Sequence, residues 1–150
     1  MAIINIKSKE RKPAALLFFM FFSIVSATIT GASVRDAVFL TQFDKSYLPV
    51  MFITIAVVMA GVIALYKKLT AGQDQIFVIS ISGALFSVSL FLLQSNLSGL
   101  FIPVLYIWME VVTILSIFQF WILAGEIFNA RQAKRIFTFL GAGGSFAGIG

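Results

Sequence analysis

A glutamate inside a long apolar run is the residue of this sequence best suited to chemistry. Glu110 lies about 15 Å along the helix expected for residues 100–124, near the middle of a membrane. An ionised carboxylate at that depth needs a partner, a proton or water. Tyr106 and Thr113 share its helical face and could donate hydrogen bonds to it. We interpret Glu110 as a substrate or proton site, the alternative being a protonated glutamate that bonds two helices together.

A second charged group, Arg35, precedes Asp36 at the end of the first apolar run, 14–34. An arginine that faces a cavity suits phosphate and carboxylate oxygens, because its guanidinium is planar and forked. The alternative is an interfacial Arg35–Asp36 pair, which contributes little in water. Arg35 is expected at the outer surface and Glu110 near the midplane. The two should therefore differ in depth by about 15 Å and should not pair directly.

Hydroxyl side chains recur on one face of the first run, at spacings of three, four and three residues. They are Ser23, Ser26, Thr30 and Ser33. This stripe could line an aqueous path, with Thr30 contacting substrate. Equally open is a structural role, in which hydroxyls bond carbonyls four residues earlier or let helices pack closely.

Small residues mark two further faces. Ser80, Ala84 and Ser87 surround Gly83 in the run 76–93, and Gly144 and Gly148 have the spacing of a GxxxG motif. Because small residues let helix backbones approach, Gly83, Gly144 and Gly148 are predicted to be packing positions. A phosphate loop is excluded, since the Gly-Lys-Ser/Thr ending that it needs is missing.

Membrane helices are the elements that must position these residues. Hydrophobic residues make up 60% of the 150 residues and charged residues 11%, whereas soluble domains are about a quarter charged. The sequence contains no Cys and no His. It therefore lacks a thiol nucleophile, a disulfide framework, and the commonest general base and metal ligand. We expect no enzyme activity, no metal site and no cofactor.

Four apolar runs have about the 20 residues that a spanning helix needs. They are 14–34, 47–66, 76–93 and 100–124. A fifth begins near Ile136 and reaches Gly150, a rise of about 22 Å against a core of roughly 30 Å. We therefore expect residues 1–150 to be one N-terminal fragment of a longer polytopic protein, packing against the remaining helices of that protein.

The cations predict the orientation. Nine lie on one side of the expected spans: Lys7, Lys9, Arg11, Lys12, Lys67, Lys68, Arg131, Lys134 and Arg135. Only Arg35 and Lys45 lie on the other, so the positive-inside rule predicts a cytoplasmic N-terminus. The last three of the nine form a basic segment that is expected to meet anionic membrane lipid. The basic residues form no folded basic face, so a nucleic-acid partner is not expected. Cleavage of the first run as a signal peptide is disfavoured, because that run is long and three more follow.

Several motifs together resemble a known family. They are Arg-Asp-Ala-Val-Phe-Leu at 35–40, Tyr-Ile-Trp-Met-Glu at 106–110, Phe-Trp at 120–121, Gln-Ala-Lys-Arg-Ile-Phe at 132–137 and Leu-Gly-Ala-Gly-Gly at 140–144. Over most of its length the chain resembles the N-terminal third of the ATP/ADP antiporters of plastids and intracellular bacteria, and more closely their bacterial major-facilitator-like relatives. The resemblance implies a twelve-helix major-facilitator-like bundle that exchanges nucleoside phosphates.

The resemblance also implies residue roles. The antiporters need a basic residue before Asp at the end of the first helix and the glutamate of a Tyr-x-Met-Glu-like motif, which fall on Arg35 and Glu110. The antiporters carry lysine at the first place, so Arg35 keeps the charge and alters the geometry. We expect a secondary transporter of the bacterial inner membrane for nucleotides or related organic phosphates, with this small anionic substrate bound by Arg35, Glu110, Tyr106 and Thr30. The alternative is a non-transporting sensor or scaffold of the same fold.

Overall fold

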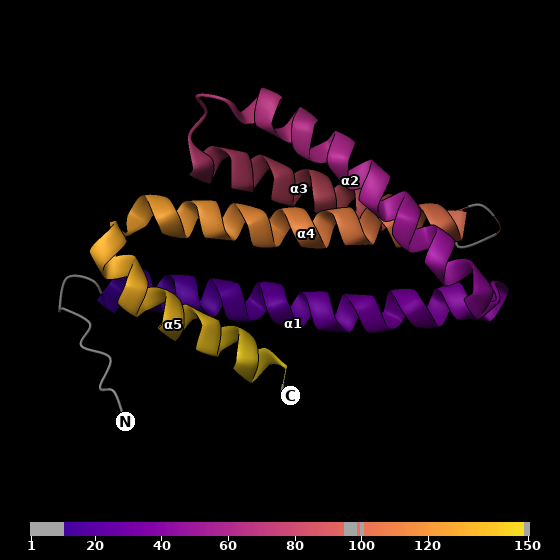
Figure 1. The fold of residues 1–150 in the computed structure, drawn as a ribbon, viewed down its shortest axis with the longest axis horizontal. Helices are drawn as coiled ribbons and strands as arrows, with labels where there is room; N and C mark the ends of the chain where they lie inside the picture. The colour runs from indigo at the N-terminus through magenta and orange to yellow at the C-terminus, as the bar shows by residue number, and fades with distance from the viewer. Residues whose placement is uncertain (1–10, 95–98, 100, 149–150) are drawn as a thin grey trace. The chain divides into compact units, whose positions relative to one another are not determined.

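The computed structural model describes residues 11–94, 99 and 101–148, which form helices joined by short connections (Figure 1). In chain order these are α1 (Arg11–Gln42), one turn of 3₁₀ helix η2 (Lys45–Tyr47), α2 (Leu48–Thr70), α3 (Gln75–Gln94), α4 (Phe101–Ile127) and α5 (Ala130–Ala147). No strand occurs within the described ranges. Helices α1 to α4 are long and apolar enough to cross a membrane. The chain is therefore an all-α, multi-pass integral membrane protein, as predicted.

Helix α1 continues past the predicted end at Val34 to Gln42. The prediction was wrong because a charged pair does not by itself end a helix, and residues 37–42 include no glycine or proline. The helix closes where the Phe43 N–H donates to the Phe39 carbonyl. The Asp44 carboxylate then accepts the Ser46 backbone N–H at 2.9 Å and caps η2. That bond lowers the pKa of Asp44, because it favours the ionised carboxylate.

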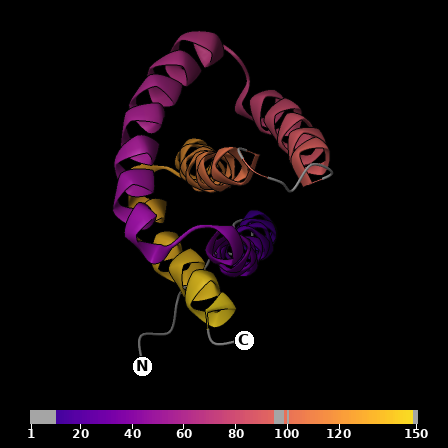
Figure 2. The ribbon, with the colours of Figure 1, turned by 90° about the vertical axis from the view of Figure 1, so that its right-hand side faces the viewer.

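Helix α2 also runs further than predicted, through Lys67 and Lys68 to Thr70, since lysine is a good helix former. At Gly72 the backbone takes a φ of +77°, a conformation that glycine adopts readily. The chain turns there and α3 runs back in the opposite direction (Figure 2). Asp74 caps α3 by accepting the backbone N–H groups of Ile76 and Phe77. The bounds of α3 agree with the predicted span 76–93 to within one residue.

Helix α5 begins at Ala130, well before the predicted start near Ile136. A reciprocal cap sets this start: the Asn129 side chain accepts the Gln132 N–H at 3.2 Å, and the Gln132 side chain accepts the Asn129 N–H at 3.1 Å. Asparagine followed three residues later by glutamine is therefore the signal that the sequence interpretation missed. The basic segment of Arg131, Lys134 and Arg135 lies in the first turns of α5 and is not a connection.

Some expectations fall on parts of the chain that the structure leaves undescribed. The tail cations Lys7 and Lys9, residues 95–98 of the connection after α3, and Gly150 lie outside the described residues.

The described chain divides into two compact units. One unit comprises residues 30–116 and has a core to which α1, α2 and α4 contribute. Its buried members are Phe39, Met51, Ile55, Met59, Ile102, Tyr106, Val111 and Leu115. Helix α3 joins this unit through α4, where the Trp108 indole N–H donates to the Ser89 hydroxyl at 2.8 Å. The spacing of four residues between the core positions of α2 places them on one helical face.

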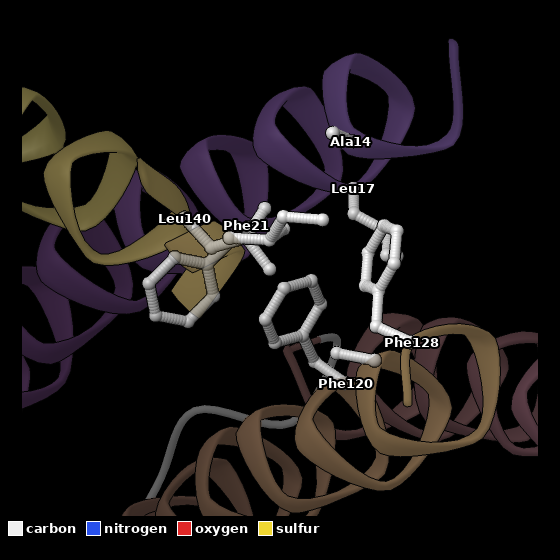
Figure 3. Packing of buried hydrophobic residues seen from close by; sticks show 8 residues of the cluster. Ala14, Leu17, Phe21, Phe120, Phe128 and Leu140 are labelled. Carbon is white, nitrogen blue, oxygen red and sulfur yellow. The ribbon is translucent and has the colours of Figure 1, made fainter. Parts of the chain in front are cut away.

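The other unit comprises residues 1–29 and 117–150, of which 11–29 and 117–148 are described. Side chains from α1, α4 and α5 converge in its core (Figure 3). The buried members are Ala14, Leu17, Phe21, Phe120, Ala124, Phe128, Ile136 and Leu140. Phe21 stacks on Phe120 with ring centroids 4.6 Å apart. A Cβ at Gly144 would lie only 2.9 Å from the Phe21 ring, so this glycine permits the close approach of α5 to α1.

Candidate functional site

The two charged residues singled out from the sequence meet in the unit 30–116. Arg35 on α1 donates from Nη1 to Oε2 of Glu110 on α4, forming an ion pair between the two helices. The expectation that these residues do not pair is therefore wrong. It placed Arg35 at the end of its helix, whereas α1 continues to Gln42.

The antiparallel register of α1 and α4 explains the pairing. Arg35 lies about 10 Å before the end of α1, and Glu110 lies about 14 Å after the start of α4, at 1.5 Å per residue. Phe39 and Tyr106 are each one helical turn closer to those ends, and their ring centroids are 4.8 Å apart. On each helix the two contacting residues are four positions apart and therefore share one face. Both contacts thus lie on the faces that α1 and α4 turn toward one another.

The Arg35 guanidinium is held by three groups. Besides Glu110, its Nε donates to the Asp36 carboxylate at 3.0 Å, and its Cζ lies 4.3 Å from the centroid of the Tyr106 ring. A cation over an aromatic face gains electrostatic stabilisation, which is larger where water is excluded. Arg35 is 9% exposed and Tyr106 is 1% exposed, so this contact is buried.

The charges at the site do not balance. One guanidinium faces the two carboxylates of Asp36 and Glu110, so the site carries a net charge of −1 when all three groups are ionised. The Asp36 side chain is 50% exposed and the Glu110 side chain 29% exposed. The two bonds to carboxylates use two of the five N–H donors of a guanidinium, and these donors lie in the planar fork that matches an oxyanion.

The other predicted substrate residue on α1 lies apart from this pair. Thr30 is exposed, and five residues of helix place it about 140° around α1 from Arg35. Within the same hydroxyl stripe, Ser23 donates to the Phe19 carbonyl at 2.8 Å. This is the structural role that was the alternative for the stripe. The structure thus brings together Arg35, Glu110 and Tyr106, and it does not bring Thr30 to them.

The predicted packing glycines differ in their surroundings. A Cβ at Gly83 would meet no atom within 4 Å, and Ser80 and Ser87 on the same face are exposed. Gly144 lies against Phe21, and a Cβ at Gly148 would be 4.0 Å from Ile29 Cδ1. The small-residue face of α3 is therefore open within the described part of the chain, whereas the Gly144 face of α5 is closely packed.

Sequence reasoning gave the Arg35–Asp36 pair only as an alternative, and it missed the role of Phe39 at this site. Asp36 shares Arg35 with Glu110, and Phe39 packs on the Tyr106 ring that lies over the guanidinium. Matching patterns on the two helices were the available signal. Along α1 a cation is followed four residues later by an aromatic ring, and along α4 an aromatic ring is followed four residues later by an anion.

The site has no feature of a metal centre. No group of three or more His, Cys, Asp or Glu side chains that could hold a metal ion is found in residues 11–94, 99 and 101–148.

The chain matches no family model, no curated protein and no solved structure. Its chemistry is therefore inferred from its own geometry, in which one arginine bonds two carboxylates.

Proposed function

We propose that this protein is a secondary transporter of nucleotides or related organic phosphates. The observation that carries the proposal is the ion pair between Arg35 and Glu110, which joins two helices that are each able to span a membrane. Ionisable residues inside membrane segments are costly, and they typically mark substrate or ion pathways. A guanidinium suits phosphate oxygens in particular, because two of its N–H groups can bond one phosphate in parallel.

Competition for Arg35 supplies the mechanism. Two unit charges 4 Å apart repel by about 4 kcal/mol at an effective dielectric constant of 20. A phosphate that bonds the outer edge of the guanidinium therefore competes with the Glu110 carboxylate, which occupies the Nη1 donor there. When the phosphate binds, the contact between α1 and α4 opens, and when it leaves, the contact closes. Alternating access needs such a contact with two states, and transporter sites lie near the membrane midplane between moving helix bundles. No covalent step is involved.

The family resemblance supports the same proposal. The residues that correspond to the required cation and glutamate of the ATP/ADP antiporters, Arg35 and Glu110, are the two that form this ion pair. We propose accordingly that the helices belong to a major-facilitator-like bundle in a bacterial inner membrane. The N-terminus is placed in the cytoplasm on the basis of the cation asymmetry.

Uptake by liposomes tests the function. The full-length protein is reconstituted, and the uptake of radiolabelled ATP and ADP is followed with and without nucleotide inside. Saturable uptake is expected for the wild type and should be lost in Arg35→Gln, because the guanidinium is removed. Lys45→Gln is the matched control, since it removes an exposed cation close to the end of the same helix. No saturable uptake by the wild type, or equal uptake by Arg35→Gln, would contradict the proposal. Binding without uptake would favour a sensor or scaffold instead.

Cysteine labelling tests the orientation, since the native chain has no cysteine. Ser46 and Gln73 are exposed and lie at opposite ends of α2. Ser46→Cys is expected to react with an impermeant reagent added outside intact cells, and Gln73→Cys only after the membrane is opened. The reverse pattern would invert the topology.

A further inference from the structure

The net charge of the Arg35 site sets a condition on anion binding. With Arg35, Asp36 and Glu110 all ionised the site is already negative, and a phosphate adds at least one more negative charge. Both carboxylates lie on the one cation that would attract the phosphate. An anion can therefore bind well only if one of these negative charges is removed or moves away.

The geometry identifies which of the two carboxylates a phosphate would displace from Arg35. Asp36 is the chain neighbour of Arg35 on the same helix and holds Nε, so a movement between α1 and α4 does not by itself separate these two residues. Glu110 holds Nη1 from another helix. An oxyanion that bonds the Nη1–Nη2 edge in parallel replaces Glu110 and leaves the Asp36 bond in place.

We propose that a phosphate displaces Glu110 from Arg35 and that Glu110 takes up one proton as it is displaced, so that anion binding is coupled to proton uptake. This inference rests on the proposed function and specifies the coupling of that same site. The proton comes from bulk water and ends on the Glu110 carboxylate, and no other bond is made or broken. Glu110 is less exposed than Asp36, and a displaced carboxylate away from water is the group that gains most from neutralisation.

Few other groups can take the proton. At the site, α1 contributes the charged groups Arg35 and Asp36, and α4 contributes the titratable groups Tyr106 and Glu110. The core face of α2 contributes apolar side chains, namely Met51, Ile55 and Met59, and Tyr66 of the same helix packs against this core. Arginine stays charged, and tyrosine is already protonated at neutral pH.

Calorimetry on the full-length protein in detergent tests the coupling. Binding of ATP and, separately, of ADP is measured at pH 8 in two buffers of different ionisation enthalpy. At this pH a phosphate group with a second pKa of about 6 is almost fully ionised, so the ATP molecule itself contributes little to the proton uptake that is measured. The wild type should take up one proton per anion bound, and its Kd should rise about tenfold per pH unit above neutrality, as linkage to one proton requires.

Two variants separate the coupling from binding. Glu110→Gln cannot ionise, so it should bind ATP at least as tightly as the wild type at pH 8, with no proton uptake and a Kd that does not change with pH. Glu126→Gln removes an exposed carboxylate from the same helix and should keep the one-proton uptake. Wild-type binding without proton uptake would overturn this inference and leave the proposed function standing. No binding by the wild type or by Glu110→Gln at any pH would overturn the proposed function. The wild-type measurement decides the inference even where Glu110→Gln fails to fold.

Discussion

Helices α1 and α4 contact one another through different chemistry in the two units. In the unit that contains residues 11–29 and 117–148, the contact consists of aromatic rings, with Phe21 stacked on Phe120. In the unit 30–116 it is an ion pair and a cation–π contact around Arg35. The stacked rings are enclosed by other apolar side chains of their core, whereas a guanidinium offers several donors to any oxyanion that reaches it. The comparison separates a contact suited to fixed packing from a contact suited to opening and closing.

The largest effect is expected on the exchangeable contact. Glu110→Gln should strongly lower nucleotide turnover in liposomes, because an amide cannot ionise and the ion pair with Arg35 can no longer reform. Membrane insertion should be unchanged. The control Glu126→Gln should keep wild-type turnover, since that side chain is exposed. Wild-type turnover in Glu110→Gln across the pH range would leave Glu110 only a structural role.

On the fixed contact, Phe120→Ala should lower the free energy of unfolding by about 3 kcal/mol and leave the substrate affinity unchanged. Phe120 is fully buried, and its removal leaves a cavity beside Phe21. The control is Phe118→Ala two residues away, where the ring is 45% exposed. Denaturant or thermal unfolding in detergent measures the difference. Equal losses for the two variants would show that the aromatic core is not closely packed.

A bulky residue at Gly144 should cost about 2 kcal/mol, because overpacking forces the neighbouring ring to move. A side chain there meets Phe21, whose own position is held by Phe120. Gly141→Leu is the control on the same helix, since a Cβ at Gly141 meets no atom within 4 Å. The melting temperature should fall for Gly144→Leu and stay close to wild type for Gly141→Leu. The opposite order would contradict the packing of α5 described here.

The smallest effect is expected where α3 meets α4. Ser89→Ala removes the acceptor of the Trp108 indole N–H and should cost about 1 kcal/mol of unfolding free energy. Ser87→Ala, on the exposed face of α3, removes a bond to the Gly83 carbonyl of the same helix and serves as control. Trp108 fluorescence should shift in the first variant alone. Identical spectra for both variants would contradict the hydrogen bond between Trp108 and Ser89.

Features that depend on neighbouring residues in the chain could be predicted from the sequence, and contacts between helices could not. The four spans followed from the length of apolar runs, because a bilayer demands that length of any helix that crosses it. The ends of α1 and α5 were misplaced because charged residues were taken as boundaries, whereas the cap at Asn129 and the absence of a breaker after Asp36 decide them. The pairing of Arg35 with Glu110 depends on the register of α1 against α4. The two residues are 75 positions apart along the chain, and the matching four-residue patterns around them do not by themselves show that the two helices are neighbours.

A double-mutant cycle on transport tests the central claim most directly. Liposome uptake of radiolabelled ATP is compared for the wild type, Arg35→Gln, Glu110→Gln and the double variant. If the two residues act as one exchangeable pair, each single variant loses transport, and the double variant is no worse than either single one. Losses that multiply in the double variant would show that Arg35 and Glu110 act independently, and unimpaired transport in either single variant would contradict the account.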